Sequence, residues 1–250
     1  MDLFSSLFSP KQNENKPSSQ LGYATELHNH LLPAIDDGVQ SIEESMQVIG
    51  ALYSFGIRKI ISTPHIKFEV FNNTPAIIAA KLEEVKTALA ARNIAIEIQA
   101  AAEYFLDEIL LDKIKSNEAL LTFGDKHILF ETSHVDACPF LTEAVFNLKL
   151  QGYKPIFAHP ERYQYGFFDF SILERIFDSG VLFQLNINSL NGYYGKEPQR
   201  QAKLLIERGM VDFVGTDAHG MRHIETLPKS IAMREYQNLL ATGKILNNQL

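Results

Sequence analysis

The sequence predicts an α/β fold in which parallel strands alternate with helices and close into a barrel. Short runs rich in Val, Ile and Phe, typical of buried parallel strands, recur about seven times after Gly22. Most are separated by segments of helical period, and no linker divides them, which favours one barrel over two domains. Polar residues follow most of the runs, where a barrel would gather them on one face. An open doubly wound sheet is the alternative, but it would spread these residues along a line too long for one site.

The predicted strands are YATELH, IRKIIST, IAIEIQAAAE, HILFETS, KPIFAHP, GVLFQLNIN and VDFVGTDAH. The predicted helices span residues 41–55, 75–92, 139–151, 171–179, 197–208 and about 228–240. Ser41 with Glu44 forms a capping box, and Thr74 precedes Pro75 in the first turn of its helix. Several helices are followed by a glycine that would end them, namely Gly56, Gly152, Gly180 and Gly209.

The N-terminal segment, the net charge and the single cysteine argue against several classes of protein. Residues 1–21 have no basic stretch and only a broken apolar run, so we expect a flexible segment that is neither a signal peptide nor a transmembrane helix. Packing of Phe4, Leu7 and Phe8 on the domain is favoured over weak peripheral membrane contact. A net charge of -7 without a basic cluster argues against nucleic acid as a partner. A single cysteine, Cys138, fits the reducing cytoplasm.

Two of the predicted strand ends carry a pair of possible metal ligands separated by one residue. In ELHNHLLPAIDDG, His28 and His30 are two residues apart, so in an extended strand both imidazoles point to the same side and can reach one metal ion. One such pair is weak evidence. Asp217 and His219 form a second alternating pair in VGTDAHG. His65 in STPHI and His159 in FAHPER each end an apolar strand beside a proline, which strengthens the interpretation as a metal site.

Glu103 in AAAEYF and Glu131 in LFETS end otherwise apolar strands, where a buried carboxylate needs a cation or a metal as a partner. A buried salt bridge is the alternative for each, but Arg162 is the one obvious inward cation. Four carboxylates against three divalent ions leave a formal surplus of about two positive charges, which would attract a phosphate dianion. Such ions would also lower the pKa of a bridging water, and Arg162 would hold phosphate oxygens. The sequence therefore predicts a multinuclear phosphate-binding metal site.

The motifs ELHNHLLPAIDDG, IISTPH, AAEYF, LFETS, AHPER and GTDAHG resemble those of the PHP-domain metallophosphoesterases. Within that group the sequence is most similar to the bacterial manganese-dependent protein tyrosine phosphatases of capsular and exopolysaccharide loci. The resemblance covers residues 22 to about 240 in order and spacing. IDDG and HPER point to this branch over histidinol-phosphate phosphatases and polymerase-associated PHP domains. It implies a PHP phosphoesterase domain over residues 22–250, folded as a single distorted, TIM-barrel-like (β/α)7 barrel.

The resemblance also implies three divalent ions, with Mn²⁺ expected and Fe²⁺ or Zn²⁺ as alternatives. The first ion would be held by His28, His30, Glu103 and Asp217. The second would share Glu103 and add Glu131 and His159. The third would take Asp37, His65 and His219. Asp36 is expected to orient a ligand or cap a turn instead.

The predicted activity is a phosphomonoester hydrolase acting through metal-activated hydroxide on phosphotyrosine, with the tail of a capsule-synthesis tyrosine autokinase as the expected partner. Arg162, Asp217 and His219 are the catalytic candidates. Relatives often carry a second phosphate-binding arginine after the D-x-H pair, and here Arg222 or His223 takes that position. The alternatives are a phosphatase for histidinol phosphate or a sugar phosphate, and a metal-binding protein without activity.

The remaining conspicuous residues receive the simpler interpretation. His127, His134 and Cys138 are expected to be surface or packing residues. A cysteine-phosphatase motif is absent, so Cys138 is not expected to act as a nucleophile. The loop tyrosines either line a groove for a peptide or only pack, and both possibilities stay open; they are Tyr163, Tyr165, Tyr193 and Tyr194.

Overall fold

The computed structural model describes residues 20–250. The prediction for Phe4, Leu7 and Phe8 lies outside these residues. Leu21 is already anchored: its side chain is fully buried, and its carbonyl accepts a 2.6 Å hydrogen bond from the hydroxyl of Tyr236. Within residues 20–250, no helix is long and apolar enough to cross a membrane.

All strand pairs in the described chain are parallel and form two ladders. The ladder order is β1-β2-β4 in one and β3-β5-β6-β7-β8-β9 in the other. Their bounds are β1 Thr25–Leu27, β2 Lys59–Ser62, β3 His65–Ile66, β4 Glu97–Ala100, β5 Glu103–Phe105, β6 His127–Glu131, β7 Lys154–Ala158, β8 Leu182–Asn186 and β9 Phe213–Gly215.

Backbone hydrogen bonds join the two ladders into a ring. Between the β2–β4 and β3–β5 pairs, the amide of Ala101 donates to Ser62 O at 2.9 Å and that of Glu103 to Pro64 O at 3.1 Å. At the other junction Asn29 and Ala218 form a parallel bridge, connecting the segments after β1 and β9. β2 with β3, and β4 with β5, are thus halves of two continuous segments. The predicted distorted barrel of seven parallel segments is confirmed.

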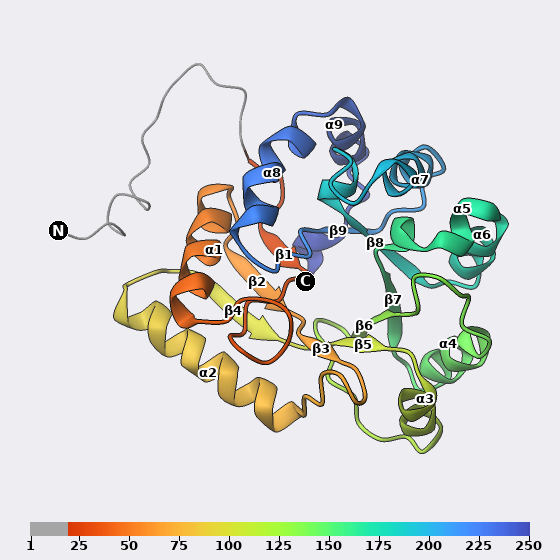
Figure 1. Cartoon of the computed structure of the whole chain (residues 1–250), viewed down its shortest axis with the longest axis horizontal. Coiled ribbons are helices and arrows are strands. Elements are labelled where there is room, and N and C mark those ends of the chain that lie inside the picture. The colour runs from red at the N-terminus through yellow and green to blue at the C-terminus, as the bar shows by residue number, and fades with distance from the viewer. Residues whose placement is uncertain (1–19) are drawn as a thin grey trace.

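Helices surround this ring in Figure 1. They are α1 Ile42–Ser54, α2 Pro75–Ala91, α3 Glu108–Lys115, α4 Leu141–Leu150, α5 Gln164–Phe168, α6 Ser171–Asp178, α7 Lys196–Glu207, α8 Met221–Ile231 and α9 Arg234–Ala241, with 3-10 turns at Pro160–Arg162, Ile187–Ser189 and Asn247–Gln249. The predicted N-caps are present, because Ser41 Oγ accepts from Glu44 N and Thr74 Oγ1 from Ile77 N. The side chain of Glu44 accepts from the amide of Gln40 rather than from that of Ser41.

Three parts of the secondary-structure prediction are wrong. The single strand expected over IAIEIQAAAE is broken into β4 and β5, opposite Pro64, whose missing N–H interrupts the neighbouring ladder. The helix expected from about residue 228 is two helices, and Pro228 lies inside α8. There the buried face of Ile224, Leu227 and Ile231 outweighs the cost of an interior proline. The short helices α3 and α5 were not predicted.

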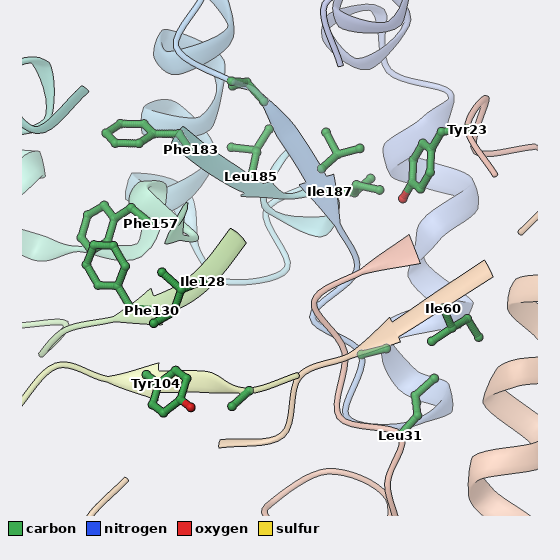
Figure 2. Close-up of a cluster of buried hydrophobic side chains, with 14 of the residues drawn as sticks. Tyr23, Leu31, Ile60, Tyr104, Ile128, Phe130, Phe157, Phe183, Leu185 and Ile187 are labelled. Atoms are coloured by element: carbon green, nitrogen blue, oxygen red, sulfur yellow. The ribbon is translucent and has the colours of Figure 1, made fainter. Parts of the chain in front are cut away.

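Alternating strand residues supply two buried clusters. The larger lies between strands and helices, and Figure 2 shows Phe130, Phe157 and Phe183 from three consecutive strands packed side by side. Their ring centroids are 5.2 Å apart for Phe130 and Phe157, and 5.9 Å for Phe157 and Phe183. The smaller cluster combines residues of several strands inside the ring, including Leu27, Leu129 and Phe213. This filled interior supports the strand ends that carry the polar residues.

Candidate metal centre

The nine predicted metal ligands come from strand ends or the turns after them, and the structure brings them together. Their nitrogen and oxygen atoms form overlapping groups in which the members lie within 4.8 Å of one another. His28 and His30 follow β1, Asp37 lies before α1, and Asp217 with His219 follows β9. The others belong to or directly follow β3, β5, β6 and β7, and these are His65, Glu103, Glu131 and His159.

The first predicted group has the spacing of ligands around one ion. Nε2 of His28 lies 3.1 Å from Oε2 of Glu103 and 3.4 Å from Oδ1 of Asp217, and Nε2 of His30 lies 3.4 Å from both oxygens. Ligands about 2.1 Å from a tetrahedral ion are roughly 3.4 Å from one another. Both Nε2 atoms and Glu103 Oε2 are buried without a hydrogen-bond partner. These residues therefore fit a divalent cation.

The second and third groups meet at His65. Nε2 of His159 lies 3.1 Å from Oε1 of Glu103 and 3.7 Å from Oε2 of Glu131. Oδ1 of Asp37 lies 3.5 Å from Nε2 of His65 and 3.4 Å from Nε2 of His219. Nδ1 of His65, however, faces Glu103 at 3.3 Å and Glu131 at 3.5 Å. His65 thus lies between the two groups.

Polar partners outside the groups fix several imidazole rings. Nδ1 of His30 donates to Asp36 Oδ2 at 2.7 Å, and Nδ1 of His28 donates to Gln184 Oε1 at 2.5 Å. Asp36 also accepts from the amides of Gly38 and His65, each at 3.0 Å. Asp36 thus has the contacts expected of a residue that orients a predicted ligand or caps a turn. Because Nδ1 carries the proton in each of these rings, the lone pair of Nε2 is available to bind a cation.

The backbone is unusual at three of these residues. His28, His159 and Asp217 have φ values of 70°, 35° and 50°, in a region that residues other than glycine rarely adopt. Two motif glycines are required by close contacts: a Cβ on Gly38 would lie 2.3 Å from His30 O, and one on Gly215 would lie 2.2 Å from the carbonyl oxygen of Leu27. Strain of this kind concentrates at functional sites.

Burial and neighbouring charges shift the pKa values of several groups in the cluster. Burial and the neighbouring Glu103 carboxylate raise the pKa of Glu131 well above its usual range. Burial opposes charge on His28, yet the carboxylates of Glu103 and Asp217 raise the pKa of its imidazole to about 9. Burial, reinforced by Arg162, lowers the pKa of His159 to about 4. The raised pKa values of Glu131 and His28 favour protons at atoms where a divalent cation would compete with them, and the lowered pKa of His159 keeps its imidazole neutral, as a metal ligand must be.

A cavity of about 540 Å³ opens beside the cluster. Of the residues expected to bind substrate, Arg162 lines it, with Nη1 2.9 Å from Asp217 Oδ2 and the guanidinium over the Tyr194 ring at 4.6 Å. Arg222 is exposed and does not line the cavity, whereas His223 does. His134, expected to be a surface or packing residue, also lines it.

Sequence reasoning missed part of the wall. Lys67, Phe71 and Phe105 line the cavity, and Nζ of Lys67 lies 4.1 Å from the centroid of the Phe105 ring. Phe105 belongs to the motif AAEYF but was not assigned a role, and Lys67 and Phe71 lie after β3, where no motif marks them. Among the loop tyrosines, Tyr163 is buried in packing contacts and Tyr194 reaches the cavity.

Cys138 lies outside this cavity. It is half-buried and lines a separate groove of about 700 Å³ between α4 and α6. Burial raises the pKa of its thiol, which is the wrong direction for a nucleophile.

Comparisons with known proteins agree with this site. Residues 24–237 match the family described as capsular polysaccharide synthesis, CpsB/CapC. The chain is 31% identical over 199 residues to the tyrosine-protein phosphatase YwqE of Bacillus subtilis, covering 79% of this chain and 78% of that protein. It is 26% identical over 201 residues to the tyrosine-protein phosphatase CpsB of Streptococcus agalactiae, covering 78% and 83%.

A solved structure indicates the same family. It comes from a description of YwqE from Bacillus subtilis and CpsB from Streptococcus pneumoniae, which are called metal-dependent tyrosine phosphatases. It superposes on this chain with a TM-score of 0.76 and 26% identity, covering 90% of this chain and 94% of that chain. The similarity spans almost the whole described fold.

Proposed function

The chain belongs to the CpsB/CapC capsular polysaccharide synthesis family, and on this premise we propose that it hydrolyses phosphotyrosine in proteins with the help of divalent cations. The observation that carries the proposal is the convergence of five imidazoles and four carboxylates beside Arg162 at one cavity. Several of their buried nitrogen and oxygen atoms have no hydrogen-bond partner. The relatives named as tyrosine-protein phosphatases support the reaction. The metal-dependent phosphatase structure supports the need for cations.

Three divalent ions, with Mn²⁺ favoured, are proposed for the three groups described above. His28, His30, Glu103 and Asp217 would hold the first, Glu103, Glu131 and His159 the second, and Asp37, His65 and His219 the third. When bound, such ions stabilise negative charge on phosphoryl oxygens and lower the pKa of a coordinated water.

Arg162 is proposed to position the phosphate. Its contact with Asp217 uses Nη1, and the ring of Tyr194 supports the guanidinium from one face. The remaining N–H groups are available to phosphate oxygens in the planar fork that suits them. Since guanidinium keeps its charge at any working pH, Arg162 holds and stabilises the transferring group and takes no part in proton transfer.

The aromatic wall supports an aryl phosphate as the substrate. Phe71, Phe105 and Tyr194 line the same cavity as Arg162 and the ligand groups. A phenyl ring bound there would gain apolar and ring contacts that a sugar phosphate lacks. We propose that the phosphotyrosine belongs to the tail of a bacterial tyrosine kinase of capsule or exopolysaccharide synthesis, and that the reaction takes place in the cytoplasm.

The test compares kcat/KM for a phosphotyrosyl peptide, histidinol phosphate and a sugar phosphate. Protein stripped with a chelator would be assayed alone and after addition of Mn²⁺, Fe²⁺ or Zn²⁺. We expect activity only with metal and the highest kcat/KM for the peptide. Preference for a small phosphate would replace the substrate assignment, and a protein that binds metal without hydrolysing any of these esters would refute the enzymatic function.

A further inference from the structure

His134 lies in the wall of the metal cavity, in the loop that follows β6 and Glu131. We propose that its imidazole is a fourth protein ligand of the second ion, together with Glu103, Glu131 and His159. This inference deepens the proposed function and rests on it. The family pattern assigns three ligands to that ion and does not include this histidine.

The distances support a ligand. Nε2 of His134 lies 3.9 Å from Oε2 of Glu131, the oxygen that also faces Nε2 of His159 at 3.7 Å. Ligand atoms of His134, Glu131 and His159 lie within 4.8 Å of one another. Around an octahedral ion with bonds of about 2.1 Å, ligand atoms are roughly 3.0 Å apart when adjacent and roughly 4.2 Å apart when opposite. Small side-chain adjustments would bring the three atoms onto one ion.

The environment of His134 argues against a packing role alone. The side chain is 37% exposed, yet Nε2 is buried without any hydrogen-bond partner. A distance of 3.9 Å to Glu131 is too long for a hydrogen bond. The ring also contacts the rings of His159 and Tyr163, at centroid distances of 5.3 and 5.4 Å. A surface histidine would be expected to turn its nitrogens to water, whereas this one directs Nε2 at a carboxylate and a second imidazole.

The loop around His134 is held in place before any ion binds. The carbonyl of His134 accepts a 2.8 Å hydrogen bond from the amide of Gln164 at the start of α5. Oγ of Ser133 accepts from the amides of Val135 and Asp136 at 3.2 and 3.4 Å. The hydroxyl oxygen of Tyr163 accepts a 3.3 Å hydrogen bond from the amide of Thr132 in the same loop. A fixed backbone reduces the entropy lost when the imidazole binds a cation.

An additional imidazole would change how firmly the second ion is held and which metal is preferred there. With three protein ligands this ion would be held less firmly than the first ion, which has four, and an additional nitrogen ligand would help to retain it. Imidazole suits Zn²⁺ and Fe²⁺ at least as well as Mn²⁺, so the extra ligand also favours nitrogen-preferring metals at this position.

The experiment measures metal binding without substrate. Chelator-stripped wild type and His134→Ala would be titrated with Mn²⁺ alone in phosphate-free buffer, and bound metal counted after equilibrium dialysis. We expect one ion to bind at least on the order of 10-fold more weakly in His134→Ala, with the other sites unchanged. His134→Cys should restore retention of Zn²⁺ better than of Mn²⁺, because thiolate is a soft ligand.

His223→Ala is the matched control. His223 lines the same cavity and contacts His219, but its Nδ1 accepts from the amide of His219 and lies in none of the candidate ligand groups. It should bind metal like the wild type. Equal melting temperatures of the stripped proteins would exclude a folding defect. Unchanged Mn²⁺ affinity in His134→Ala would refute the inference alone, whereas failure of the wild type to bind metal would refute the proposed function as well.

Discussion

Replacing the two adjacent aspartates one at a time should separate support of the site from binding of the cation. The side chain of Asp36 has no exposed surface, and that of Asp37 is 57% exposed. Asp36 accepts hydrogen bonds from His30 Nδ1 and from two backbone amides, those of Gly38 and His65. Asp37 contacts only imidazoles of its ligand group among the interactions described above.

The magnitudes follow from these partners. Asp36→Ala leaves two backbone N–H groups of a buried turn without an acceptor, which costs about 1–3 kcal/mol each. The free energy of unfolding should therefore fall by roughly 2–6 kcal/mol. That is a large part of a typical stability of about 5–15 kcal/mol. Asp37→Ala removes an exposed carboxylate from a cluster rich in negative charge, and should change the stability of the metal-free protein by no more than about 0.5 kcal/mol.

Urea unfolding of the chelator-stripped proteins, followed by circular dichroism, measures the stability of both variants. Titration with Mn²⁺ measures their affinity for metal. Both variants should bind metal more weakly, but only Asp36→Ala should be unstable without it. Equal stability of the two stripped variants would refute the assignment of Asp36 as the structural partner of this turn.

Four further outcomes are expected. Arg162→Ala should keep its metal content while kcat/KM falls on the order of 10²-fold. Arg162→Lys should recover only part of the loss, because lysine restores the charge without the planar fork of guanidinium N–H groups. Wild-type kinetics of Arg162→Ala with its metal sites fully occupied would make Arg162 a structural partner only. Glu103→Ala should lose bound metal by elemental analysis, and full retention would contradict its shared position. Cys138→Ser should keep activity in a phosphopeptide assay, since a large loss would argue for thiol chemistry. Gly215→Ala should lower the melting temperature clearly, because its Cβ would overlap the carbonyl oxygen of Leu27 at 2.2 Å; an unchanged melting temperature would show that this turn can relax.

The barrel and the meeting of the predicted ligands could be foreseen because both follow from local rules. Apolar runs define strands, and the carboxyl ends of parallel strands meet on one face, so residues as distant as His28 and Asp217 were expected together. The break near Pro64 was readable in principle, since proline cannot donate to a ladder. The side chains of Lys67 and His134 were not foreseen, because the direction of a loop after a strand depends on tertiary contacts such as the bond from Gln164 to His134 O.

The left-handed backbone at three of the predicted ligands was equally difficult to foresee. Histidine and aspartate adopt positive φ more often than most residues but far less often than glycine, so the residue types at His28, His159 and Asp217 did not mark this conformation. The conformation is maintained by neighbours, among them the amide of Asp217, which donates to the carbonyl of His28 at 2.8 Å and ties the two strained segments together. Strain shared between the turns of two predicted ligands would fix the geometry of the first group before a cation binds.

The charge balance of the cavity explains how an acidic chain can bind a phosphate dianion. Four carboxylates, those of Asp37, Glu103, Glu131 and Asp217, line the cavity together with the cations of Lys67 and Arg162, so without metal the cavity offers a phosphate little net positive charge. Three divalent ions would make this field strongly positive, and Coulomb attraction in a partly desolvated cavity is stronger than at the surface. The net charge of -7 therefore argues against a long polyanionic partner but not against a single phosphate group. Substrate affinity should consequently depend on metal occupancy, because the same ions that complete the site also supply the positive charge that admits the substrate.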